Sequence, residues 1–236
     1  MREAPTTFLA TVPANTHARL NVTERFVVVV GKEKKEIPVI TSIATRSSKF
    51  FQAAMNHGWK EAHEKRVPLP ETRVDIFEGY VQWLYTGHIT FTENDAPGYF
   101  LLIRFYILGD YLDDVNFHHA VLDHFVAFYL DSSRVPGRKI VKFVWDNTTS
   151  DSLLRQLILD LWSIMQLDYS ITHILGPVNT WYPQDFLHQH FERWMSTNAL
   201  AGVRRTVKES KQVIADFKLR IFCEGVVADN EVGKKG

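Results

Sequence analysis

The sequence has one cysteine, no excess of charge of either sign and no long hydrophobic run. The single thiol, Cys223, excludes an intramolecular disulfide and is typical of a reducing compartment. Lys plus Arg and Asp plus Glu each number 27, so that no net charge attracts nucleic acid or anionic membrane. The longest apolar-rich stretch, residues 99–112, is interrupted by Arg104 and Asp110 and is too short to span a bilayer. The N-terminus also lacks the basic and apolar regions of a secretory signal, and we therefore expect a soluble protein of the cytoplasm or nucleus.

Motifs for catalysis and metal binding are missing as well. The chain has no Gly-rich phosphate loop and no Gly-x-Ser-x-Gly nucleophile elbow. His118 and His119 are adjacent, so that on a helix their side chains point about 100° apart and do not readily share an ion. The same objection applies to His188 and His190, and no Cys or carboxylate at ligand spacing completes either pair. We therefore expect no enzyme activity, no cofactor and no metal.

Aromatic residues, at 13% of the chain, are plentiful enough for a core, and residues 36–91 show a regular alternation of elements. Apolar spacing and turn residues predict strand, helix, strand, helix and strand at 37–40, 43–55, 66–69, 77–85 and 88–91. Thr72 and Asp75 form an approximate capping box before the second helix, which should end at Gly87. The β-branched run 25–30 should form a hairpin with 37–40, and Pro38 leaves that strand with one free side.

The remainder of the chain predicts helices. Residues 99–108 are apolar nearly all round, which indicates a buried helix, and Gly109 should break it. The acidic group Asp110, Asp113 and Asp114 is well placed to supply caps at this junction. Further apolar stripes indicate helices at 117–129, 140–145, 154–165, 187–194 and 203–221.

Four motifs together resemble the BTB (POZ) domain, in its order and at its spacing. They are SSKFF at 47–51, GWKE at 58–61, RVPLP at 66–70 and WLYTG at 83–87. The later helices resemble, more weakly, the helical extension of fungal BTB proteins. The resemblance implies an α+β, mostly helical fold, in which a BTB/POZ domain precedes an all-α C-terminal region. The expected units are a flexible arm at 1–22, the BTB/POZ domain at 23–130, a helical region at 138–222 and a flexible tail at 223–236.

The resemblance also implies a protein-interaction function without catalysis. BTB adaptors of cullin ubiquitin ligases carry a hydrophobic-x-Glu motif before the Arg-Val strand, and Trp59, Lys60 and Glu61 occupy that place here. A large apolar residue in a polar loop is costly unless it finds a pocket. We therefore predict Trp59, Lys60 and Glu61, together with Met55, as partner-binding residues. The alternative is that Trp59 folds back onto Phe51 or Met55.

Two functions follow from this resemblance. The first is a substrate adaptor that binds a cullin scaffold protein, and the alternative is a BTB scaffold or transcriptional co-regulator. The sequence has no recognisable kelch, MATH or zinc-finger module, so an adaptor would have to read its unknown substrate protein through the helical region.

Oligomeric state and nucleic-acid binding are further questions. Glu24 and the pair Ile40-Thr41 stand where dimeric BTB domains have an Asp and a basic residue that form a charged interface pocket, so we expect mainly monomer. The basic residues of 203–221 favour either a partner, import or nucleic-acid contact or a solvated helix face. Since aromatic interleaving and a second basic element are missing, we expect the solvated face.

Overall fold

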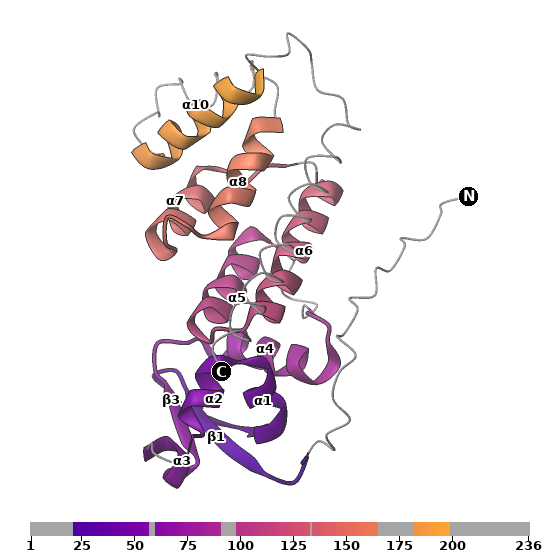
Figure 1. The fold of residues 1–236 in the computed structure, drawn as a ribbon, viewed down its shortest axis with the longest axis vertical. Helices are drawn as coiled ribbons and strands as arrows, with labels where there is room; N and C mark the ends of the chain where they lie inside the picture. Colours follow the sequence, from indigo (N-terminus) through magenta and orange to yellow (C-terminus); the bar gives the residue numbers. More distant parts are fainter. Residues whose placement is uncertain (1–20, 57–59, 91–97, 133, 165–181, 199–236) are drawn as a thin grey trace, which may run out of the picture.

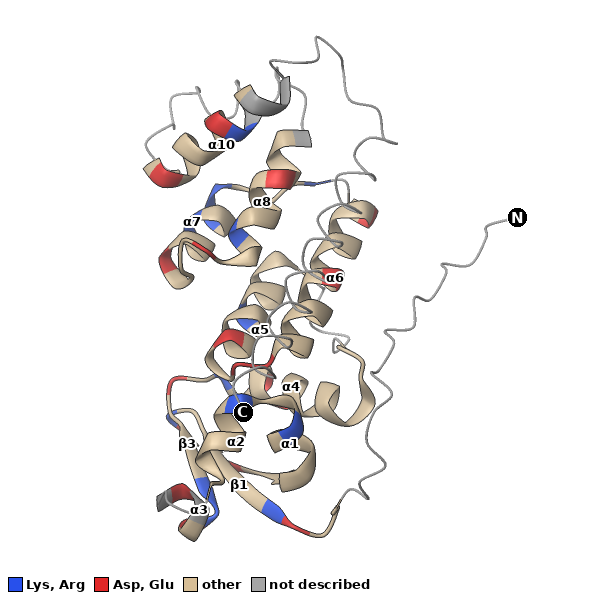
Figure 2. Cartoon of the chain, in the orientation of Figure 1, with Lys and Arg blue, Asp and Glu red and all other residues tan. Residues whose placement is uncertain are grey.

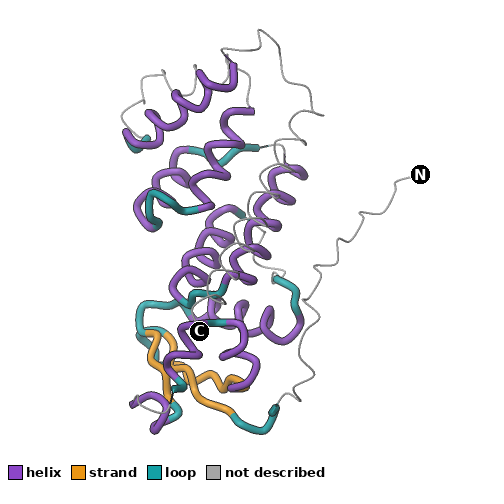
Figure 3. Tube along the Cα trace, viewed as in Figure 1, coloured by secondary structure: helices purple, strands orange, loops and turns teal. Residues whose placement is uncertain are grey.

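The computed structural model describes residues 21–56, 60–90, 98–132, 134–164 and 182–198. A small sheet with short helices lies at one end, and longer helices are stacked away from it toward the other (Figures 1 and 3). The expected α+β, mostly helical fold is confirmed. The predicted arm at 1–22, helix at 203–221 and tail at 223–236 lie outside the described residues, apart from positions 21 and 22.

The sheet has the strand order β2-β1-β3. β1 (Arg25–Val30) pairs antiparallel with β2 (Lys35–Ile40) and parallel with β3 (Arg66–Leu69). The expected hairpin is thus confirmed, and Gly31 with φ of 71° makes its turn. Alternate residues of β1 (Phe26, Val28 and Val30) are fully buried beneath the helices. The sheet therefore has one face buried on the core and an outer face that mixes half-buried valines, such as Val27 and Val29, with charged side chains.

The helix predicted over 43–55 is in fact two helices, α1 (Thr41–Ser47) and α2 (Lys49–Ala54). Ser48 lies between them in an extended conformation, with φ of −108° and ψ of 123°. Its hydroxyl donates to the Leu112 carbonyl at 2.6 Å and accepts from the amide of Phe51 at 3.1 Å. Ser48 is therefore the N-cap of α2. The apolar spacing alone could not show the break, because it depends on a partner 64 residues away.

The helix α4 (Val74–Thr86) ends at Gly87, as predicted, where φ is 72°. The predicted capping box is wrong, because the N-cap is Arg73 with no side-chain cap and Asp75 pairs with Arg73 instead, at 2.6 Å. The strand predicted over 88–91 is also wrong for its described residues, which have no strand partner. Ile89 is buried because it packs on the core and not because it belongs to the sheet.

The helices α5 (Tyr99–Tyr111) and α6 (Val115–Ser132) form the centre of the molecule. Gly109 does not break α5 but lies within it, which corrects the prediction. A Cβ at this position would meet Cδ2 of His118 at 2.8 Å and Cδ1 of Phe117 at 3.0 Å. Gly109 is thus required for the close approach of α6. The chain turns between the two helices at Asp113, whose φ is 46°.

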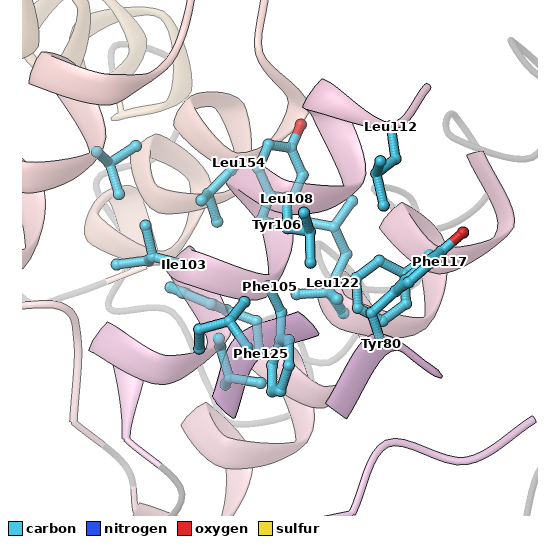
Figure 4. Packing of buried hydrophobic residues seen from close by; sticks show 14 of the residues in the cluster. Tyr80, Ile103, Phe105, Tyr106, Leu108, Leu112, Phe117, Leu122, Phe125 and Leu154 are labelled. Carbon is cyan, nitrogen blue, oxygen red and sulfur yellow. The ribbon is translucent and has the colours of Figure 1, made fainter. Parts of the chain in front are cut away.

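Three further helices, α7 (Arg138–Asn147), α8 (Leu153–Ile164) and α10 (Gln184–Asn198), continue the stack. Leu154 of α8 packs beside Ile103, Tyr106 and Leu108 of α5, so that one apolar core crosses the predicted boundary at 131–137 (Figure 4). The folding of 23–130 as an independent domain stays a prediction.

The connection between α6 and α7 is held from two sides. The hydroxyl of Tyr99 donates to the carbonyl of Arg134 at 2.5 Å, and the indole N–H of Trp162 donates to the carbonyl of Pro136 at 3.0 Å. These bonds satisfy backbone acceptors that would otherwise be left beside the core.

Candidate functional site

The predicted site lies where α2 leads into α3 (Lys60–Glu64) and β3. Met55 caps the C-terminus of α2 and is half-buried against the core. Glu61 lies in the first turn of α3 and is also half-buried. Lys60 is the first residue of α3, and Trp59 falls outside the described residues. The structure therefore gives Met55 and Glu61 as half-buried residues on either side of positions 57–59, and α3 contacts β3.

Ion pairs fix the outer face of the sheet next to this site. Arg66 on β3 pairs with Glu36 on β2 at 2.6 Å, so that the pair crosses the central strand β1. The hydrogen bond and charge of Arg66 lower the pKa of the Glu36 carboxyl. Glu24 is paired with Lys65 at 3.1 Å within the chain. All four side chains are largely exposed, and such pairs contribute little to stability but add charge to this face.

An exposed aromatic pair lies at the junction of α2 and the end of α5. The ring of Phe50 lies 5.2 Å from that of Tyr111, which is 57% exposed. Lys49 and Asp113 form an ion pair at 3.6 Å beside it. The sequence analysis missed this pair, since the two rings are 61 residues apart in the chain and meet only through tertiary packing. Solvent-exposed aromatic rings of this kind are typical of protein-binding surfaces.

A buried polar network supports the surface from below. Asp114 is fully buried and accepts hydrogen bonds from the hydroxyls of Ser47, at 2.6 Å, and Tyr80, at 2.8 Å, and from the amide of Phe117, at 3.0 Å. Burial raises the pKa of the Asp114 carboxyl, although these bonds favour its ionised form. The predicted capping role is confirmed for Asp114, which joins α1, α4 and α6 and so positions α2 and the site.

Among the histidines, two are held by packing. His118 stacks on Tyr106 with ring centroids 4.4 Å apart, and its Nε2 lies 3.0 Å from the Tyr106 carbonyl oxygen. His190 is buried beside Phe186 and Trp162, and burial lowers its pKa to about 4. Within the described ranges no three His, Cys, Asp or Glu side chains gather as metal ligands. No helix in the same ranges is long and apolar enough to cross a membrane.

These features define the class of the protein's N-terminal part: a small α+β domain with exposed aromatic and charged groups over a rigid core, as in protein-interaction modules. Residues 24–119 match the family model of the BTB/POZ domain and are a BTB/POZ domain, a protein-interaction module. The chain is also similar to Kelch-like protein 38 of Danio rerio, with 34% identity over 65 residues. That match covers 28% of this chain and 11% of the relative's length, so it concerns only a segment of either protein.

Proposed function

We propose that this protein is a substrate adaptor for a cullin-based ubiquitin ligase and has no catalytic activity of its own. The observation that carries the proposal is the position of the hydrophobic-x-Glu motif. Its glutamate, Glu61, lies half-buried in the first turn of a short surface helix, and Met55 caps the preceding helix. A cullin would contact this edge of the BTB/POZ domain.

Tyr111, exposed beside the half-buried Phe50, offers a second apolar contact for a partner. The ring of Tyr111 is pre-positioned by Phe50, and the backbone amides of Lys49 and Phe50 donate to the carbonyls of Asp113 and Leu112, both at 3.3 Å. A surface whose side chains are already ordered loses less conformational entropy on binding. Tyr111 would thereby give a cullin an ordered aromatic contact at the junction of α2 and α5.

A BTB scaffold or transcriptional co-regulator is the second candidate. The match to the Kelch-like relative covers 11% of that protein's length. The relative's remaining regions therefore have no counterpart in the match, which favours a scaffold over a complete Kelch-like adaptor. Such a scaffold would use the same domain for partners other than a cullin.

Binding to a purified cullin N-terminal domain distinguishes the two. The full chain should be retained on the immobilised cullin domain, and Trp59→Ala or Tyr111→Ala should weaken binding by about 30- to 1,000-fold if each is an anchor. Glu61→Ala should cost less if its contact is at a wet rim. Glu33→Ala, in the exposed hairpin turn, is the matched control and should bind normally.

Melting temperatures of the same variants exclude a packing effect. If Trp59 instead folds back onto the domain, Trp59→Ala loses about 3–5 kcal/mol of stability and leaves cullin affinity unchanged. No retention of the wild-type chain would favour the scaffold.

A further inference from the structure

Four side chains of α5 and α7 form a surface patch outside the site described above, here called the aromatic-basic patch. Phe100 and Arg104 come from α5, and Lys139 and Phe143 come from α7. The two rings meet edge to face with centroids 5.6 Å apart, and the Arg104 guanidinium lies 5.8 Å from the centre of the Phe143 ring. Phe100 remains 40% exposed, and Lys139 is exposed.

The spacing places each cation beside a ring. Phe100 and Arg104 are four residues apart on α5, and Lys139 and Phe143 are four apart on α7, so each pair shares one helix face. The two pairs meet where α5 contacts α7, and Figure 2 shows the Lys and Arg positions on both helices. The result is an apolar centre with a positive charge contributed by each helix.

The charges of the patch are not neutralised within the described part of the chain. No described carboxylate lies within ion-pair distance of Arg104 or Lys139, whereas the neighbouring Lys142 is paired with Asp146 at 2.8 Å. A purely structural role explains the buried part of Phe143, which packs against the core. It does not explain why Phe100 is 40% exposed on a surface that also carries the cations Arg104 and Lys139.

We propose that the aromatic-basic patch binds a short acidic peptide segment of a partner protein. An apolar side chain of the segment would lie against Phe100 and Phe143, and carboxylates on either side of it would pair with Arg104 and Lys139. Charge complementarity selects this occupant, and Arg is well suited to carboxylates because its guanidinium offers a planar fork of donors. Nucleic acid is disfavoured because strong phosphate binding draws on many cations and the patch has two.

This inference rests on the proposed function and adds the surface through which an adaptor would read its substrate. Phe100 lies in the first turn of α5 and Tyr111 is its last residue. The two positions are therefore about 16 Å apart along the helix axis, at 1.5 Å per residue. The two surfaces can accordingly be mutated independently.

The test measures fluorescence polarisation of a labelled peptide with the full chain. The probe is a decapeptide with a central Leu-Phe pair flanked by glutamates, and the control peptide has lysines in place of the glutamates. Because the chain has zero formal net charge, general electrostatic attraction does not favour the acidic probe. The acidic probe should bind, the lysine peptide should not, and binding should weaken as salt screens the exposed charges.

Variants locate the binding to the patch. The double variant Arg104→Glu/Lys139→Glu should bind the acidic probe about tenfold more weakly and should gain binding of the lysine peptide. Phe100→Ala should also reduce the affinity for the acidic probe by about tenfold. Arg46→Glu, an exposed charge reversal on α1, is the matched control and should bind the acidic probe as the wild type does.

Several outcomes would overturn the proposal. They are an acidic probe that binds no better than the lysine peptide, a Phe100→Ala protein with unchanged affinity, and an Arg46→Glu protein weakened as much as the double variant. Tighter binding of single-stranded oligothymidine than of the acidic probe would assign the patch to nucleic acid. The peptide assay contains no cullin, so a negative result there does not bear on cullin binding. The double variant should still bind the cullin domain.

Discussion

Pro38 and Pro68 lie on the two opposite edge strands of the sheet, beside Val27 and Val29 of β1. The amide of Val27 donates to the carbonyl of Lys65 and therefore points toward β3, so that its partner on β2, Pro38, faces away from β1. The carbonyls of Lys65 and Leu69 both accept from β1, so that Pro68 on β3 also faces outward. Each proline thus removes a donor from the edge at which another strand would add.

We therefore predict that the chain does not self-associate through its sheet and is mainly monomeric at micromolar concentration. Sedimentation equilibrium should give close to 27.3 kDa. The variant Pro38→Thr/Pro68→Thr restores both donors with a good strand former and should shift the average mass upward. A wild-type mass of twice this value would contradict the prediction, and an unchanged mass for the double variant would show that the prolines are not what limits association.

Gly109→Ala should destabilise the protein because the new methyl group meets Cδ2 of His118 at 2.8 Å and Cδ1 of Phe117 at 3.0 Å. Overpacking of this kind costs about 1–3 kcal/mol, which urea denaturation resolves as a lower midpoint. Gly137→Ala is the matched control, because its added Cβ has no atom within 4 Å. Equal stability of the two variants would mean that α6 can move away from α5 freely.

Asp114→Ala should be far more costly than Asp113→Ala. The first leaves the buried hydroxyls of Ser47 and Tyr80 and the amide of Phe117 without their acceptor. Breaking such a buried network costs about 3–5 kcal/mol. The second removes an exposed ion pair with Lys49 at 3.6 Å, worth about 1 kcal/mol or less, and leaves Ala at a φ of 46°, which adds about 1 kcal/mol. Chemical denaturation of both variants at neutral pH measures the difference, and similar losses would contradict the network's role.

His190 should make the stability pH-dependent. Burial lowers its pKa from 6.5 to about 4 in the folded chain, so the unfolded chain binds the proton more readily. The contribution of neutral His190 to the free energy of unfolding is therefore fully present above pH 6.5, and it is lost as the pH decreases from 6.5 toward 4. His190→Gln should flatten this part of the free-energy curve, whereas Gln184→Ala, at an exposed position without a titratable group on the same helix, should not. Parallel slopes for the wild type and His190→Gln would refute the assignment.

The sequence predicts those elements whose burial repeats regularly along one segment. The strand β1 and the stop at Gly87 needed only local information, whereas the alternating burial along β1 was not predicted from its unbroken apolar run. The break at Ser48 and the glycine within α5 did not follow from local patterns, because the first depends on the carbonyl of Leu112 and the second on the side chains of α6. Local propensity and period are overridden where a distant residue supplies the hydrogen bond or limits the space.

The candidate site divides in the same way. The polar stretch around Glu61 predicts a place near the surface, but it predicts a loop and not the short helix α3 that the structure has there. The pairs Phe50–Tyr111 and Phe100–Phe143 do not, since each joins two helices that are brought together only by the fold. In a sequence, an aromatic residue at the surface cannot be distinguished from one in the core. Only the packing of the helices shows which rings remain exposed.

The bonds that Tyr99 and Trp162 make to the linker before α7 have a mechanical consequence. The carbonyl of Arg134 accepts a hydrogen bond from Tyr99 of α5, and the carbonyl of Pro136 accepts one from Trp162 of α8. The two bonds therefore restrict bending of the chain at Arg134 and Pro136. A protein bound at α7 would keep a nearly constant orientation and distance relative to a protein bound at α2 and α3. The chain would then act as a spacer of defined geometry between its two partners.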